Sequence, residues 1–253
     1  MLSDTALPLF IFLSAPFLAF MYKSVSITAT GYLLSGWVTF LIATIIYIKD
    51  HKLTLPSTKR VFDLFKFSLP LTISNYASFG LIWTNIILLG YFIGSESAGL
   101  YNAALPISYA LTLGLSAVNY IFLPLTSNSH SRDENDEIKK LYNLVVRWLT
   151  AFSLPIMLLL VTKSKFIITT LFGTSYSPAA IALAIIALGR FTDVFFGPLG
   201  QILVGLGKTK QEAFARLAGL TTLIFVSLLL IPDHEVLGAS IGFLVGFTLT
   251  NLT

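Results

Sequence analysis

The sequence contains no cysteine, which excludes a disulfide framework, a thiolate metal site and a cysteine nucleophile. Histidine is scarce, and the three that occur, His51, His130 and His234, are widely spaced in predicted loops. That spacing argues against a histidine metal site. Charged residues make up only 11% of the chain, whereas a soluble domain carries about a quarter. The sequence therefore lacks the polar surface of an ordinary soluble protein.

Hydrophobic residues make up 55% of the 253 residues. They are gathered into runs of about twenty, long enough for a helix to cross the roughly 30 Å hydrocarbon core of a bilayer. Eight such segments are expected at roughly 5–22, 27–48, 67–93, 98–125, 141–162, 178–205, 211–231 and 235–253. The sequence therefore predicts an all-α membrane protein, a polytopic bundle of about eight transmembrane helices.

The net charge of +4 could suggest a nucleic-acid partner, but lysine and arginine in a membrane protein more often mark cytoplasmic loops. Basic residues concentrate in alternate connections, at 49–66, 132–140 and 208–210. The opposite connections carry few. This bias predicts a multi-pass protein of the plasma membrane, with the N-terminus of the chain in the cytoplasm and no nucleic acid bound.

Two connecting segments have the composition of helices that lie at the membrane surface. Arg60 to Phe67 is amphipathic and belongs to the predicted cytoplasmic loop. Ser164 to Phe172 is predicted to form a short helix that ends at Gly173, a residue type that commonly ends helices.

The strongest candidate site is a charged pair, Arg190 and Asp193, near the middle of the sixth segment. Charges at that depth usually face a cavity or each other. At a spacing of three residues they share a helix face, which Gly197 and Gln201 would continue. One interpretation is that Arg190 meets an anionic substrate group, while Asp193 holds it or takes up a coupling cation. The other is an intrahelical pair that only fixes packing.

Weaker polar stripes occur on the third and fourth segments, and their members could line a wet cavity or hydrogen-bond between helices. The candidates are Asn75, Ser78 and Asn85, then Asn102, Tyr109, Thr112, Ser116 and Asn119. Arg147, near the start of the fifth segment, can reach the headgroups or meet a phosphate at a cavity mouth.

Catalytic motifs do not emerge from the sequence. Gly207 to Thr209 resembles the end of a phosphate-binding loop, but the earlier glycine that the motif needs falls on Ile202. No convergent set of carboxylates or Ser/His/Asp arrangement supports hydrolysis. We therefore expect no catalytic residue, no enzyme activity, no metal and no cofactor, with Na⁺ or H⁺ left open as a coupling ion.

From about Phe62 onward the chain resembles the C-terminal half of polysaccharide biosynthesis proteins of the O-antigen flippase type. That family lies within the superfamily that also holds multidrug exporters. The matching pieces, in chain order, are Phe67–Pro70, Leu89–Gly94, Ala98–Ala104, Leu154–Pro155, Leu171–Tyr176, Gly205–Lys210, and Leu230–Pro232 with Gly238–Ala239. One departure is Asn85, where the family commonly has an aspartate.

The resemblance implies two six-helix lobes that alternate access to a central cationic cavity. On that basis residues 1–48 would be the last two helices of an incomplete N-terminal lobe. Residues 49–66 would be a cytoplasmic loop with an interfacial helix, and 67–253 a six-helix C-terminal lobe. The chain would then be a fragment of a two-lobe transporter.

The function implied is a flippase that moves a polyprenyl- or dolichyl-linked oligosaccharide for surface polysaccharide or glycoprotein synthesis. Its partners would be the lipid-linked glycan, membrane lipids, and glycosyltransferases or a polymerase of the same pathway. Two alternatives are open, a cation-coupled multidrug exporter and a membrane glycan polymerase. The polymerase is disfavoured because the predicted outer loops are short.

Overall fold

The computed structural model describes residues 58–131 and 135–253, together with scattered helical positions between 30 and 45. The expected segment 5–22 and most of the loop before Thr58 lie outside the described residues. The chain divides into two compact units, 1–61 and 62–253. The description that follows concerns the second unit, with the first turn of the helix that leads into it.

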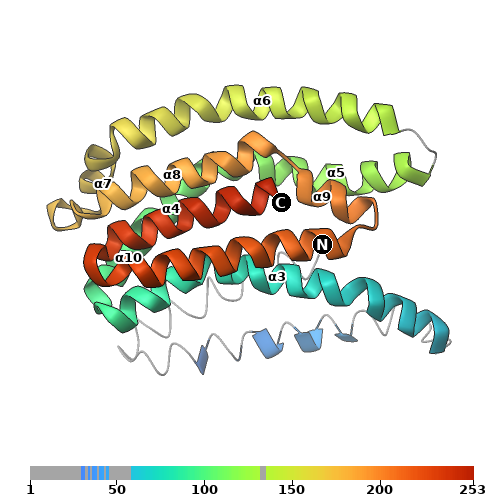
Figure 1. Cartoon of the computed structure of the whole chain (residues 1–253), viewed down its shortest axis with the longest axis horizontal. Helices are drawn as coiled ribbons and strands as arrows, with labels where there is room; N and C mark the ends of the chain where they lie inside the picture. Colours follow the sequence, from blue (N-terminus) through green and yellow to red (C-terminus); the bar gives the residue numbers. More distant parts are fainter. Residues whose placement is uncertain are drawn as a thin grey trace. The chain divides into compact units, whose positions relative to one another are not determined.

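The described part of this unit is entirely helical (Figure 1). Its elements are α3 (Thr58–Phe92), α4 (Ser95–Ser108), a 3₁₀ turn η1 (Tyr109–Thr112), α5 (Leu113–Ser131), α6 (Asn135–Thr162), α7 (Ser164–Phe172), a 3₁₀ turn η2 (Thr174–Tyr176), α8 (Ala179–Phe196), α9 (Leu199–Gly205) and α10 (Thr209–Leu252).

Five stretches of the described residues are long and apolar enough to cross a membrane. They are Leu64–Phe92, Ser95–Ser129, Asp136–Thr162, Ala179–Phe196 and Thr209–Leu252. Every apolar segment expected from residue 67 onward falls on one of them. The prediction of an all-α, polytopic membrane protein is thereby confirmed for this part of the chain.

The last stretch holds two of the expected segments. α10 bends sharply at Glu235, whose φ of 47° and ψ of −121° are not helical. The two halves lie side by side and run in opposite directions, in orange and red in Figure 1. Gly246 lies against Leu223, and a Cβ on Gly238 would come within 2.5 Å of the Leu230 carbonyl. Glycines thus let the two halves approach closely, as in other membrane helix pairs.

Two short predicted helices are found, one of them in a different setting. α7 spans Ser164–Phe172 and ends at Gly173, whose φ of 91° favours glycine, so that prediction is confirmed. The helix predicted at Arg60 to Phe67 does not stand apart from the span after it. Both belong to the continuous helix α3, which contains Pro70 without ending there. The expected boundary between loop and lobe at residue 66 is therefore inside a helix.

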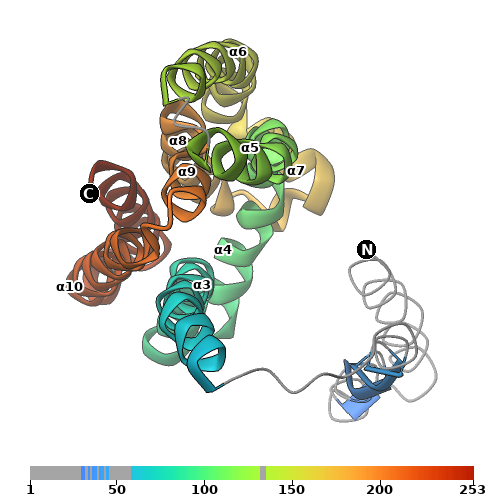
Figure 2. The same ribbon diagram turned by 90° about the vertical axis from the view of Figure 1, so that its right-hand side faces the viewer.

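α8 is the central helix of this unit. It packs against α4, α6, α7 and α10, and Figure 2 shows α8 between α6 and α10. Its inward residues Leu183, Ile186 and Ala187 are fully buried, together with Tyr101 and Phe243 from neighbouring helices. A helix buried on most sides can carry charges only where partners or a cavity accommodate them. Arg190 and Asp193 lie at the end of this helix.

The segment expected at 178–205 is broken in the structure. α8 ends at Gly197, with φ 68° and ψ −152°, and α9 begins directly after Pro198. A Cβ on Gly197 would lie 2.5 Å from Val146 of α6, and the Tyr142 hydroxyl donates to the Phe196 carbonyl across 2.8 Å. The break follows from a left-handed backbone and a close approach that only glycine tolerates.

Candidate functional site

A polar pocket of about 240 Å³ opens where α8 breaks. Side chains from η1, α5, α8, α9 and both halves of α10 line it. They are Tyr109, Thr112, Leu115, Ser116, Asn119, Arg190, Asp193, Gly197, Pro198, Gly200, Gln201, Arg216 and Asn251. A polar cavity within a bundle of apolar helices is the usual form of a substrate or ion site in a membrane protein.

Interrupted helices place these groups. α4 gives way to the 3₁₀ turn η1 shortly after Pro106, and the Thr112 hydroxyl donates to the Tyr109 carbonyl within that turn. On the opposite wall, the break at Gly197 turns the chain so that Gln201 of α9 also reaches the pocket. Mid-helix 3₁₀ turns and broken helices are common at functional sites of membrane proteins.

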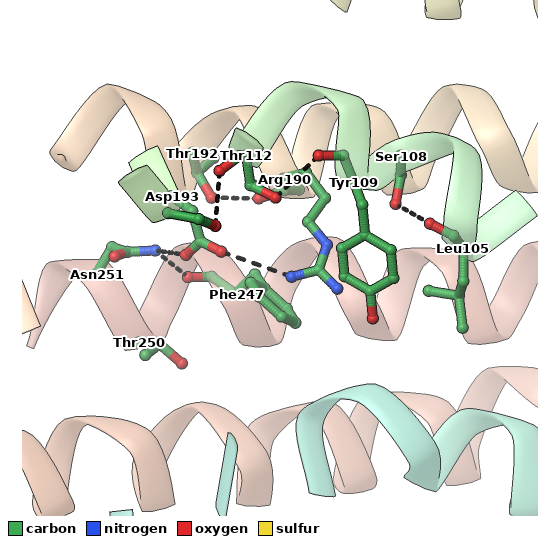
Figure 3. A network of polar contacts seen from close by, with 12 residues as sticks. Leu105, Ser108, Tyr109, Thr112, Arg190, Thr192, Asp193, Phe247, Thr250 and Asn251 are labelled. Atoms are coloured by element: carbon green, nitrogen blue, oxygen red, sulfur yellow. Dashed lines mark hydrogen bonds and ion pairs between the residues drawn. The ribbon is translucent and has the colours of Figure 1, made fainter. Parts of the chain in front are cut away.

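Arg190 is the most constrained charge in the pocket. Arg190 is 5% exposed, and its guanidinium carbon lies 4.5 Å from the ring centre of Tyr109 and 4.8 Å from that of Phe247. Figure 3 shows the guanidinium between these two rings. Phe243 adds a third ring face at 5.2 Å. Aromatic faces attract cations, most strongly where water is excluded, so the rings stabilise a buried positive charge.

The acids near Arg190 are already engaged by other groups. The closest Arg190–Asp193 contact, Nη1 to Oδ2, is 3.9 Å, longer than a hydrogen bond. Asp193 Oδ1 instead accepts from Asn251 Nδ2 at 2.8 Å (Figure 3). Glu212 Oε1 accepts a hydrogen bond of 2.8 Å from Arg216 Nε, one helical turn away. Asp193 and Glu212 thus each accept a hydrogen bond from a residue other than Arg190.

Unused hydrogen-bonding groups remain. Among the described residues, Arg190 Nε and Nη2 are buried without an acceptor, and Asn119 Oδ1 is buried without a donor. Buried polar atoms are rarely left unpaired. Nε and Nη2 lie on one edge of the guanidinium, an arrangement that binds two oxygens of a phosphate or carboxylate. The pocket can thus take an oxyanion at Arg190 and a hydroxyl donor at Asn119.

Five of the nine candidate residues predicted from the sequence meet in this pocket: Tyr109, Asn119, Arg190, Asp193 and Gln201. Gln201 was expected on the same helix face as Arg190, but it lies on the separate helix α9 and reaches the pocket because the chain turns at Gly197. The other four lie elsewhere: Asn75, Asn102 and Arg147 are exposed on their helices, and Asn85 is fully buried.

Asn85 is the centre of a separate hydrogen-bond network. Its Nδ2 donates to the Tyr101 hydroxyl at 3.1 Å and to the Ala239 carbonyl at 2.7 Å. Its Oδ1 accepts from the Ser227 hydroxyl at 2.7 Å. The side chain therefore joins α3 to α4 and to both halves of α10, which supports the packing interpretation for this residue.

Sequence reasoning missed Arg216 and Asn251. Arg216 and Glu212 form a charged pair four residues apart inside an apolar segment, the same signal that revealed Arg190 and Asp193. Asn251 has no comparable signal in the sequence. It reaches Asp193 only because the second half of α10 folds back beside α8. No cluster of three or more metal-ligating side chains occurs among the described residues.

The fold is similar to that of solved membrane transporters. It is similar to an outward-facing multidrug resistance transporter of the MATE family, in the MOP superfamily, with a TM-score of 0.73 and 14% sequence identity. The likeness covers 99% of this chain and 59% of that one. At such low identity the likeness establishes the fold alone, an all-helical fold that resembles part of a MATE transporter.

The sequence pattern of the polysaccharide biosynthesis protein family matches residues 2–181. The chain belongs to this family, and the resemblance seen in its motifs is confirmed. The match begins well before Phe62, where that resemblance was first apparent.

Two relatives indicate the range of the family. TuaB, the teichuronic acid biosynthesis protein of Bacillus subtilis, is 29% identical over 125 residues, which are 49% of this chain and 26% of TuaB. AglR, a probable flippase of Haloferax volcanii, is 22% identical over 241 residues, which are 93% of this chain and 50% of AglR. The chain thus spans half or less of these relatives.

Proposed function

We propose that this chain forms part of a flippase that carries a polyprenyl- or dolichyl-linked oligosaccharide across the membrane by alternating access. The observation that carries the proposal is the buried Arg190 guanidinium, which faces a polar pocket with two donors unused. Family membership and relatives described as flippases support a lipid-linked glycan as the cargo.

The physical difficulty in such transport is the headgroup. An isolated ion moved into hydrocarbon costs tens of kcal/mol in the idealised limit, and a diphosphate carries more than one charge. A fixed arginine in a polar pocket lowers that barrier by replacing water with charge-assisted hydrogen bonds. Asn119 and Gln201 supply an acceptor and an amide for sugar hydroxyls. The polyprenyl tail remains in the bilayer throughout.

A second candidate is a cation-coupled multidrug exporter. The fold likeness to multidrug transporters and the acids Asp193 and Glu212 favour it. Both acids are held by Asn251 and Arg216, however, whereas the unused groups on Arg190 are donors. The pocket is thus better prepared for an anion than for a cationic drug.

Deletion of the gene that encodes this chain distinguishes the two functions. We expect loss of surface glycan and accumulation of the lipid-linked oligosaccharide on the cytoplasmic leaflet, measured by leaflet-selective labelling of membrane vesicles. Restoration by the wild-type gene is the control. Drug hypersensitivity with normal surface glycan would reject the flippase and favour the exporter.

A further inference from the structure

A second hollow of about 380 Å³ lies apart from the Arg190 pocket, at the start of α10. Its lining residues are Lys66, Phe67, Gly207, Lys208, Thr209, Lys210 and Gln211. Three are lysines and none is acidic. Glu212, which follows directly in sequence, is buried and turned to Arg216. The hollow, called the basic groove below, thus has a net positive charge of three.

The packing of α3 on the first half of α10 brings these lysines together. Gly80 lies against Leu220, and further along the two helices Asn85 accepts a hydrogen bond from Ser227. The two helices therefore run parallel, with each residue of α3 facing the residue about 140 positions later in α10. Continued toward the helix starts, that register brings Lys66 beside the turn at Gly207, in agreement with the groove lining. Both helices begin at the right-hand side of Figure 1.

The groove also offers unused hydrogen-bond donors. No side chain caps the start of α10, and among the described residues the backbone N–H groups of Thr209 and Lys210 have no acceptor. The Thr209 side chain lines the groove, is 4% exposed and has no hydrogen-bond partner in the described part of the chain. A helix start with free N–H groups and an unpaired threonine hydroxyl is well suited to a phosphate.

The surroundings indicate the source of that phosphate. Lys66 lies at the start of the Leu64–Phe92 span, and Thr209 opens the last span. The groove is therefore at the depth of the lipid headgroups. Phe62, Leu64 and Phe65 are highly exposed one turn earlier on α3, a composition that suits contact with acyl chains.

We propose that the basic groove binds the phosphate group of an anionic membrane lipid, with Lys66, Lys208 and Lys210 around the phosphate and Thr209 and the start of α10 donating to it. A lipid with a terminal phosphate suits the groove better than a phosphodiester, because its second negative charge meets the third lysine. This site does not depend on the glycan cargo, so the proposal can be tested separately from the proposed flippase function.

Native mass spectrometry of the purified full chain tests the proposal. The chain is equilibrated with mixed micelles of phosphatidylcholine and phosphatidic acid, and the retained lipid is counted. We expect preferential retention of phosphatidic acid. Lys208→Gln with Lys210→Gln should reduce it by roughly thirtyfold, since each lysine near an anionic surface contributes about fivefold. Thr209→Val, which keeps the shape and removes the hydroxyl, should reduce retention several-fold.

The matched control is Lys139→Gln with Lys140→Gln, two adjacent exposed lysines on the first turns of α6. It removes the same charge outside the groove and should leave retention unchanged. Equal losses in the control and groove variants, or no preference for phosphatidic acid, would overturn the proposal. Displacement of the lipid by millimolar inorganic phosphate would overturn the lipid as the source and assign the groove to a free phosphate.

Discussion

Arg190 is a buried cation whose nearest acid stands too far away to accept a hydrogen bond from it. Three aromatic rings surround it, and two of its donors are unused. The charge itself was predictable from the sequence, because an arginine at that position in an apolar segment demands an explanation. The three aromatic rings around it were not predictable, because Phe243 and Phe247 look like ordinary apolar residues in the sequence. They meet Tyr109 and Arg190 only because the second half of α10 folds back along the first.

Asn85 illustrates the opposite outcome at the same scale. Its position on a polar stripe favoured packing over cavity lining without excluding either, and only the structure reveals three hydrogen bonds that use both ends of the amide. Neighbouring residues on the stripe behave differently, as Asn75 is exposed. Helical periodicity gives the face of a residue but not the partner that this face meets.

Asn85→Ala should destabilise the folded protein by roughly 1–3 kcal/mol, because the Ser227 hydroxyl and the Ala239 carbonyl lose a buried partner. The free energy of unfolding in detergent is the measurement. Asn75→Ala, on the same helix but exposed, is the control and should change it by less than about 0.5 kcal/mol. Equal effects of the two substitutions would contradict the network.

At the scale of elements, the apolar runs predicted the helices of the second unit well, because a span must be long and uninterrupted by charge. The end of α7 at Gly173 was also predictable from residue type. The break after Phe196 was not, since it depends on contact between Gly197 and Val146 of a distant helix. The extension of α3 through Arg60 to Phe67 was likewise hidden by the polar residues there.

The hairpin in α10 depends on close approach at its glycines. Gly238→Ala should destabilise the protein by roughly 1–3 kcal/mol, because its new Cβ meets the backbone carbonyl of Leu230 rather than a movable side chain. Thermal unfolding of the purified chain measures this.

Gly99→Ala is the matched control for that substitution. Gly99 lies within α4 and has no heavy atom within 4 Å of an added Cβ. The substitution should be neutral or stabilise the helix by up to about 1 kcal/mol. A Gly238→Ala protein as stable as wild type would show that the two halves of α10 pack less closely than described.

At the scale of the whole molecule, orientation is a prediction from the basic loops alone. The absence of native cysteine allows a direct measurement with single introduced cysteines. In intact cells, a membrane-impermeant maleimide should label Ser175→Cys in η2, whereas Lys140→Cys on α6 should react only after permeabilisation. Both sites are exposed. The reverse pattern would place the N-terminus outside.

The central claim is that this chain supplies the anion site of a glycan flippase, and its most direct test is the outer-leaflet level of lipid-linked oligosaccharide in cells that carry Arg190→Ala in the full-length protein. Arg147→Ala, an exposed arginine outside the pocket, is the control. We predict that Arg190→Ala lowers that level by roughly ten- to a hundredfold, as expected from charge-assisted hydrogen bonds of about 1.5–3 kcal/mol. Arg147→Ala should leave it unchanged. A well-expressed, folded Arg190→Ala protein with wild-type levels would contradict the claim.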